Sequence, residues 1–383
     1  MCYNARVRKT FLYRLYPTGS QRRAMNQTLE ECRWLYNRLL EERRLAWEAA
    51  DASVSLYDQH KRLPMLKQER PSLDTVHSQV LQNVALRIDL AFKAFFRRVR
   101  AGEKPGYPRF RGRGRYDSFC YPQAPSGCQL QGERLHLSKI GPVRVVLHRP
   151  LEGTPKTVCI RRSATGKWYA NFSCEIEATP LPPLDTAVGI DVGLTNFTAL
   201  STGESIENPR FFRQEERALA RAQRRLSKEA KGTAKRRKRK KVVARVHERI
   251  VNRRRDFAHQ HSRRIVNRFQ VIAVEDLSVN RMVHNHCLAK SIQDAAWSQF
   301  AACLSYKAAN AGRSFVAVNP AYTTQDCSQC GHRQPVPQGE RVYSCPCCGL
   351  HLDRDHNASL NIRALGLQSL GLALEASGFS RGE

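Results

Sequence analysis

Apolar side chains spaced three and four residues apart predict helices in the first hundred residues. The opening segment RVRKTFLYRLYP is predicted to be a strand, and a helix follows it over residues 20–50. A second long helix is predicted over residues 73–101. Pro64 and Pro71 are expected to interrupt the helical block between the two.

The apolar period then changes from that of a helix to that of a strand. Gly and Pro in KPGYPRFRGRGRYDSF mark a loop. In KWYANFSCEIE, which follows, apolar and polar side chains alternate strictly, as in a half-buried strand. The shorter segments RLHLSK, PVRVVLH and KTVCIRRS are also predicted strands. Together they predict a small antiparallel barrel.

The Pro-rich segment ATPLPPLD is the main predicted domain boundary. Beyond it, the apolar runs in AVGIDVGLTN, QVIAVEDLS and SFVAVNP predict buried strands, and FTALST is the expected hairpin partner of the first. Helices are predicted in the basic segment, with a break near Gly232, over residues 291–312, and from about Asn357 onwards. This mixture indicates an α/β domain.

The net charge of the chain indicates which kind of partner the protein binds. The 383 residues include 64 Lys/Arg and 34 Asp/Glu, a formal net charge of +30. Between Pro209 and Arg268, 23 basic residues face 5 acidic ones, an excess of +18. A surplus of this size repels itself unless a polyanion neutralises it, so nucleic acid is the first candidate. A solvated helix face is the alternative, and a membrane surface is the second-ranked partner.

The 13 cysteines are odd in number and scattered outside one cluster. The N-terminal residues have no apolar run of a secretory signal. These features predict a protein of a reducing compartment, the prokaryotic cytosol or nucleoid, without a disulfide framework. Eight cysteines are expected to pack as small apolar residues: Cys2, Cys32, Cys120, Cys128, Cys159, Cys174, Cys287 and Cys303.

Acidic residues stand at the ends of the predicted buried strands and before the last helix: Asp191, Glu275, Asp276, Asp353 and Asp355. A buried carboxylate is costly unless its charge is compensated. Mg²⁺ prefers oxygen ligands, and two such ions about 3.5–4 Å apart can hold the attacking and leaving oxygens of a phosphodiester. Turn or helix-capping roles are the alternatives, and spacing alone does not separate Glu275 from Asp276 or Asp353 from Asp355.

Two CxxC pairs, each followed by glycine, predict a structural zinc site. They are Cys327 with Cys330 and Cys345 with Cys348, separated by fourteen residues. Four thiolates at this spacing suit tetrahedral Zn²⁺. Cys347 could replace Cys348, but the two-residue gap favours the latter because it brings backbone amides to the first sulfur.

In combination, several of these segments resemble TnpB, a family of transposon-encoded RNA-guided nucleases related to type V CRISPR effectors. The segments GIDVGLTNF, VIAVEDL, NPAYTTQDCSQCG, CPCCG and DRDHNASLNIR resemble its split RuvC motifs and zinc ribbon, and GYPRFRGRG resembles its Gly-x-Pro-Arg-Phe loop. The resemblance covers nearly the whole chain. His356, Ser359 and Thr324 differ from the residues common in the family, and none of these differences removes a ligand.

The resemblance implies a multi-domain α/β protein. Residues 183–325 and 350–383 would form an RNase H-like RuvC nuclease domain, with the zinc ribbon, 326–349, inserted. Residues 1–16 and 105–180 would form a wedge barrel of the oligonucleotide-binding type, interrupted by a helical recognition insert at 17–104.

The resemblance also implies roles for particular residues and partners. Asp191, Glu275 and Asp355 would be the catalytic residues and the Mg²⁺ ligands, with Asp276 and Asp353 as neighbours. The partners would be a guide RNA from the same element and a double-stranded DNA target with a short adjacent motif. A monomer in the RNA complex would cut both strands at one site, leaving 5′-phosphate ends.

Further residues are candidates for contacts with nucleic acid. Gln and Asn suit paired contacts with adenine, and Arg and Lys suit phosphates, although a solvent-facing helix surface is the alternative for the helical ones. The candidates are Tyr57, Gln79, Gln82, Asn83, Arg109, Arg111, Arg113, Arg224, Arg225, Arg236, Lys240, Arg249 and Arg253.

Rival functions are a DNA transposase, a guide-RNA-bound repressor without cleavage, and a zinc-ribbon RNA-binding protein. The repressor would require a lost acid, and none is lost. The RNA-binding protein leaves the three acids without a role. His284 and His286 could suggest an HNH-type nuclease, but no supporting metal spacing follows them, so they are expected to be loop residues.

Overall fold

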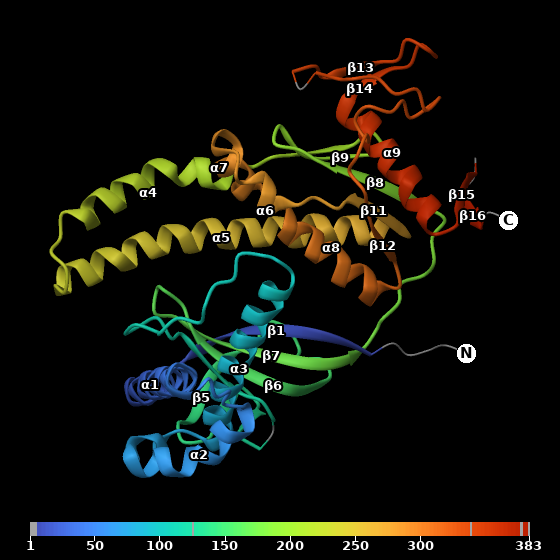
Figure 1. The fold of residues 1–383 in the computed structure, drawn as a ribbon. Helices are drawn as coiled ribbons and strands as arrows, with labels where there is room; N and C mark the ends of the chain where they lie inside the picture. Colours follow the sequence, from blue (N-terminus) through green and yellow to red (C-terminus); the bar gives the residue numbers. More distant parts are fainter. Residues whose placement is uncertain (1–5, 125, 338, 376–377, 382–383) are drawn as a thin grey trace. The chain divides into compact units, whose positions relative to one another are not determined.

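The computed structural model describes residues 6–124, 126–337, 339–375 and 378–381, which fall into two compact units. The first unit comprises Arg6–Glu177, and the second contains the described residues from Ala178 onwards. The change from one unit to the other therefore occurs at the start of the Pro-rich segment ATPLPPLD. Figure 1 shows the elements of both units.

The first unit contains an antiparallel seven-stranded sheet in the order β2-β6-β7-β1-β5-β4-β3. Its strands are β1 (Arg6–Tyr16), β2 (Ser118–Tyr121), β3 (Cys128–Gln131), β4 (Arg134–Leu137), β5 (Gly141–Val146), β6 (Thr154–Arg162) and β7 (Trp168–Glu177). The period-two pattern of β7 buries Trp168, Ala170 and Phe172 against Phe11 and Tyr13 of the core. The sheet is nearly closed, with β2 and β3 at its two ends. The predicted antiparallel strands are therefore confirmed, but the two end strands do not pair to complete a barrel.

Helices of the first unit occupy the chain between β1 and β2. They are α1 (Gly19–Ala50), α2 (Leu56–Glu69), a 3-10 turn (Pro71–Thr75) and α3 (Ser78–Arg100). The prediction for Pro64 is wrong: it lies inside α2, where the buried Leu63 and Leu66 hold the helix to its neighbours. Pro71 opens the 3-10 turn, so the second long helix starts at Ser78, later than predicted.

Cys120 and Cys159 form a disulfide, which contradicts their predicted role as free apolar side chains. They are partners in the antiparallel register of β2 and β6, with Cα atoms 4.0 Å apart. Sequence spacing does not reveal this pairing, because strand register brings the residues together. Cys287 is exposed rather than packed, and Cys2 lies outside the described residues. The other four cysteines of this group are buried, as predicted: Cys32, Cys128, Cys174 and Cys303.

The second unit is built on a mixed five-stranded sheet in the order β10-β9-β8-β11-β12. Its strands are β8 (Ala187–Val192), β9 (Asn196–Leu200), β10 (Ser205–Glu207), β11 (Val271–Glu275) and β12 (Ser314–Val318). β9 pairs with β8 in the predicted antiparallel hairpin, whereas β11 is parallel to both β8 and β12. Two small hairpins follow: β13 (Val342–Ser344) with β14 (His351–Asp353), and β15 (Leu372–Glu375) with β16 (Gly378–Arg381).

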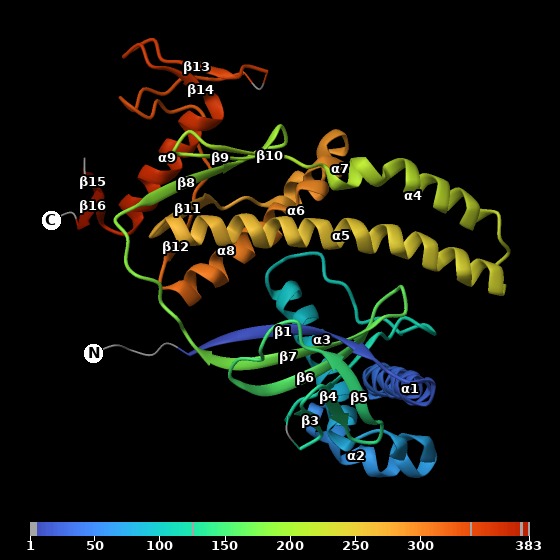
Figure 2. The ribbon, with the colours of Figure 1, turned by 180° about the vertical axis from the view of Figure 1, so that it is seen from behind.

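Helices cover both faces of this sheet. They are α4 (Phe211–Ser227), α5 (Ala234–Arg268), α6 (Val279–Met282), α7 (His286–Ala295), α8 (Trp297–Ala311) and α9 (Arg354–Ser369). Side chains of α5 and α8 pack with Val188, Ile190 and Ile272, while α9 packs on the other face against Ala273. Figure 2 shows α4 and α5 as a long hairpin. α4 ends at Ser227 and α5 begins at Ala234, so the predicted break near Gly232 is confirmed.

Two helix boundaries in this unit differ from the prediction. The expected helix over residues 291–312 is divided into α7 and α8 at Ala296, which has a left-handed backbone (φ 57°). The last helix begins at Arg354 rather than near Asn357, so Asp355 lies in its first turn. None of the described helices combines the length and the apolar character required to cross a membrane.

Candidate functional site

Asp191 and Glu275 lie side by side near the carboxyl ends of β8 and β11. The two strands are parallel, and their register pairs Ile190 with Val274, so the residues that follow these two are neighbours as well. Side chains alternate along a strand, so Asp191 points to the same face as Gly189. That face carries α9, and the two acids therefore point toward this helix.

Close packing of α9 on β8 brings Asp355 to the same edge of the sheet. A Cβ atom at Gly189 would overlap the Ser359 carbonyl oxygen and the Arg363 backbone nitrogen. Only glycine leaves room for this approach of helix to strand. The first turn of α9, which contains Asp355, is thereby held beside the end of β8.

Asp191 is only 8% exposed and experiences the charge of both other acids. Burial, reinforced by the carboxylates of Glu275 and Asp355, raises the pKa of Asp191 from 3.8 to about 8. The Arg354 guanidinium and the Val192 backbone N–H act in the opposite direction but do not cancel this effect. The three acids therefore form one electrostatically coupled group, in which Arg354 offsets only part of the repulsion at Asp191.

Glu275 and Asp355 each have a partner that fixes the side chain. Burial raises the pKa of Glu275, and the Thr323 hydroxyl opposes this by donating a 2.6 Å hydrogen bond to Oε1. Arg354 lies 3.2 Å from Oδ1 of Asp355, and Arg341 lies 3.4 Å from its Oδ2.

Asp353 and Asp276, the two neighbouring acids, have different surroundings. Asp353 caps α9, because its Oδ1 accepts hydrogen bonds of 3.0 Å from the backbone N–H groups of Asp355 and His356. Asp276 is exposed, and its backbone N–H donates to the Val318 carbonyl.

The three acids are chemically suited to bind a divalent cation, but their carboxylate oxygens do not lie as close together as the cysteine sulfur atoms. Their ligand atoms are carboxylate oxygens in a negatively charged, mostly buried setting, which Mg²⁺ prefers. Within the described parts of the chain, only the four cysteines form a group whose ligand atoms all lie within 4.8 Å of one another.

That group contains Cys327, Cys330, Cys345 and Cys348, the set that the spacing predicts. Cys347 is exposed and lies outside the group. Backbone N–H groups of Cys348 and then Cys347 lower the pKa of the Cys345 thiol to about 6. A metal ligand must be the thiolate, so the lowered pKa favours metal binding at Cys345 itself.

Three of the candidate basic residues on the α4–α5 hairpin make contacts within the hairpin, although Arg249 and Arg253 are also exposed. Arg236 donates to the Leu226 and Glu229 carbonyls at the end of α4, and Arg249 pairs with Glu215 at 2.9 Å. The Arg253 guanidinium lies 4.7 Å from the Phe211 ring centre. These three arginines contribute to the hairpin itself, a role that charge counting missed. The remaining candidates are exposed on its surface: Arg224, Arg225 and Lys240.

Candidates in the first unit also differ in their contacts. Tyr57 is 65% exposed, and Lys61 lies over its ring. The Gln79 amide donates to Gln123, and Asn83 accepts from Arg87. The loop arginines and the remaining glutamine are exposed: Gln82, Arg109, Arg111 and Arg113.

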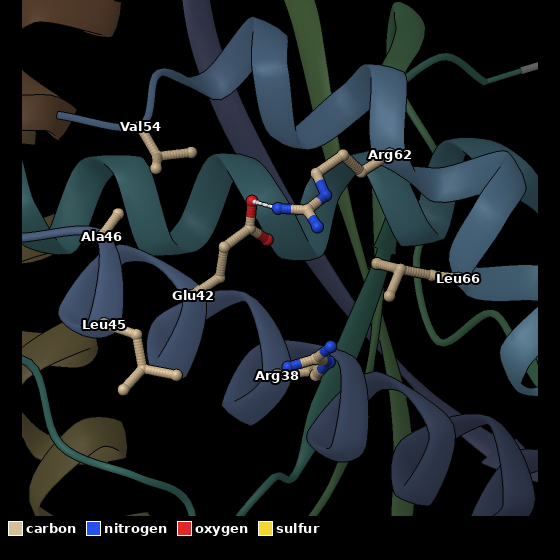
Figure 3. A pocket seen from close by; sticks show the side chains of 7 residues that line it. All are labelled: Arg38, Glu42, Leu45, Ala46, Val54, Arg62 and Leu66. Atoms are coloured by element: carbon tan, nitrogen blue, oxygen red, sulfur yellow. Dashed lines mark hydrogen bonds and ion pairs between the residues drawn. The ribbon is translucent and has the colours of Figure 1, made fainter. Parts of the chain in front are cut away.

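A cavity of about 360 Å³ lies beside α1 and α2, and sequence reasoning did not anticipate it. Figure 3 shows Arg62 paired with Glu42 across it, with Nη1 and Oε1 2.6 Å apart. The other lining residues are Arg38, Leu45, Ala46, Val54 and Leu66. None of the candidate residues for nucleic-acid contact lines this cavity.

His284 and His286 are both exposed, the first in a turn and the second at the start of α7. They form no metal-ligand group within the described residues.

Three family models match separate parts of the chain. Residues 171–286 match a model described as "Probable transposase", and residues 297–362 match "Cas12f1-like, TNB domain". Residues 1–51 match "Helix-turn-helix domain", although the described part of this range forms one strand and one long helix.

Curated relatives match over nearly the full length. A Streptomyces pristinaespiralis protein named "Putative RNA-guided DNA endonuclease" is 38% identical over 368 residues, 94% of this chain and 90% of the relative. An Escherichia coli protein named "Putative RNA-guided DNA endonuclease InsQ" is 32% identical, over 94% and 92% of the two chains.

A solved structure supports the likeness at the level of the fold. The protein of a "Cas12f1-sgRNA-target DNA complex" aligns with a TM-score of 0.56 and 16% identity, covering 90% of this chain and 82% of that one.

Proposed function

The chain belongs to the TnpB (IS605 OrfB) family, and on this premise we propose that it is an RNA-guided DNA endonuclease of a transposon. The observation that carries the proposal is that strand register and the packing of α9 bring Asp191, Glu275 and Asp355, which are distant in sequence, to one edge of the sheet. A buried group of like charges is typical of a site that binds cations or transfers protons. The relatives' names supply the reaction class.

In this proposal, Asp191, Glu275 and Asp355 hold two Mg²⁺ ions. When bound, the ions neutralise the carboxylates and favour attack of a water on the scissile phosphorus. The residues of the chain prepare this site. Thr323 orients Glu275, and the Asp353 cap fixes the turn that presents Asp355. Because burial and the neighbouring acids disfavour the charged form of Asp191, binding of divalent cations would release its proton to solvent.

The proposed partners are a guide RNA and a double-stranded DNA target. Base pairing with the guide would read the target sequence, while the protein would read only a short adjacent motif. The exposed basic side chains of the α4–α5 hairpin would hold the phosphate backbone. The first unit would supply the wedge barrel and the helical recognition insert, and the cysteine cluster would hold a structural Zn²⁺.

Asp191→Ala tests the proposed nuclease site directly. With guide RNA and Mg²⁺, cleavage of a plasmid target should fall by about a thousandfold or more, because a metal ligand is lost, while RNA binding survives. Asp276→Ala is the matched control, because it removes a neighbouring exposed acid and should retain cleavage. An Asp191→Ala variant that cuts at the wild-type rate would refute the assignment.

A DNA transposase is a second candidate, favoured by the description of the model that matches residues 171–286. Incubation of the purified protein with transposon ends distinguishes the two. Strand-transfer products without guide RNA would support the transposase, and guide-dependent linear product would support the endonuclease.

A further inference from the structure

The base of the cysteine ribbon is hydrogen-bonded to the acid site at several points. Thr323 lies four residues before Cys327 and is only 3% exposed. Its hydroxyl donates to Glu275 Oε1 at 2.6 Å. The segment that leads into the first CxxC pair therefore fixes one of the three acids.

Two asparagines of α9 hold this segment in place. The Asn361 side chain donates to the carbonyls of Thr323 and Asp326, at 2.8 and 2.7 Å. Asn357, which is fully buried, donates to the Asp326 carbonyl at 2.8 Å and accepts from the Ser328 backbone N–H at 3.0 Å. Asp326 and Ser328 flank Cys327, so the first cysteine pair is attached directly to the helix that carries Asp355.

The second cysteine pair is linked to the same helix by the β13–β14 hairpin. β14 ends at Asp353, the cap of α9, and pairs with β13, which leads to Cys345. Arg341, just before β13, accepts a backbone hydrogen bond from Arg354 and lies 3.4 Å from Asp355.

We propose that the metal-bound ribbon positions Glu275 and Asp355, so that an ion at the four cysteines controls the affinity of the acid site for divalent cations. The inference rests on the proposed function, because it takes the acids as ligands. Thr323 is a positioning residue: it touches Glu275 rather than substrate or metal. The partners of metal ligands commonly change metal affinity by about 10–100-fold when they are removed.

The test measures Mn²⁺ binding to the zinc-loaded, full-length protein by electron paramagnetic resonance, a readout independent of cleavage. Thr323→Val keeps the side-chain shape but removes the hydroxyl, and should weaken Mn²⁺ binding about tenfold. Thr323→Ser, which restores the hydroxyl, should bind as the wild type does. Thr324→Val is the matched control, since it makes the same change at the neighbouring residue and should leave the affinity unchanged.

Removal of the ribbon's metal extends the test. Cys345→Ser should lose zinc and weaken Mn²⁺ binding at least as much as Thr323→Val, with guide-RNA binding as the check that the rest of the chain is folded. Unchanged Mn²⁺ affinity in both variants would overturn the inference. If instead Asp191→Ala leaves Mn²⁺ binding intact, the proposed function fails, and the two failures are therefore distinguishable.

Discussion

The cysteine cluster is built from residues 327–348, whereas the acid site combines Asp191, Glu275 and Asp355, which are far apart in the chain. The two CxxC turns are enough to bring the four cysteine sulfur atoms within 4.8 Å of one another. The acids depend on strand register, on the contact of α9 with β8, and on the hydrogen bond that Thr323, just before the ribbon, donates to Glu275. The difference teaches that a site built from one short segment is complete in itself, whereas a site built across a sheet depends on packing elsewhere.

The largest expected effect comes from the local site. Cys345→Ser should reduce bound zinc from about one ion per chain to almost none, because a structural site needs all four thiolates. Elemental analysis of the purified protein measures this. Cys347→Ser is the control and should keep its zinc, since that side chain lies outside the cluster. Zinc loss in both variants would show that the cluster is not the one in the structure.

A change in packing should break the acid site while sparing the cysteines. The methyl group of Gly189→Ala would overlap backbone atoms of α9, so this substitution should destabilise the second unit by about 3 kcal/mol. Divalent-ion affinity should fall with it, because α9 carries Asp355. Zinc content should not change.

Gly339→Ala is the matched control for this substitution, since an added Cβ there meets nothing within 4 Å. Its unfolding free energy should stay within about 0.5 kcal/mol of the wild type. If Gly189→Ala melts like the wild type and binds Mn²⁺ normally, the acid site does not depend on this contact.

A smaller, graded effect is expected from pH. Because the pKa of Asp191 is raised from 3.8 to about 8, the folded protein holds a proton that the unfolded chain releases. Without divalent ions, the unfolding free energy should therefore fall as pH rises from about 4 to 8. Asp191→Asn should flatten this part of the profile, as followed by thermal melts in chelator-treated buffer. A rise in stability over the same range would contradict the raised pKa.

Much of this architecture could be predicted because its signals are local. The period-two pattern of β7, the helix after β1 and the break near Gly232 depend on residues close together in the chain. The four cysteines and the cap at Asp353 are of the same kind. The sequence did not predict that α2 continues through Pro64. Tertiary packing of α2 outweighs the tendency of proline to interrupt a helix.

Long-range pairing could not be predicted in this way. The Cys120–Cys159 disulfide follows from the register of β2 and β6, which no spacing encodes. Arg236 was counted with the nucleic-acid candidates, yet it donates to the Leu226 and Glu229 carbonyls at the end of α4, because only the folded hairpin brings them within reach.

The order of residues along the chain already contains the available chemistry: a basic chain, four cysteines in two short pairs, and acids at the ends of apolar runs. Only the tertiary structure decided that Asp191 experiences the charges of Glu275 and Asp355, and that the ribbon reaches them through Thr323 and Arg341. The two kinds of feature differ in how far apart in the sequence the interacting residues are. Turns and periodic faces arise from neighbours along the chain, whereas the pKa of a buried acid depends on every charge and dipole that folding brings within a few ångströms.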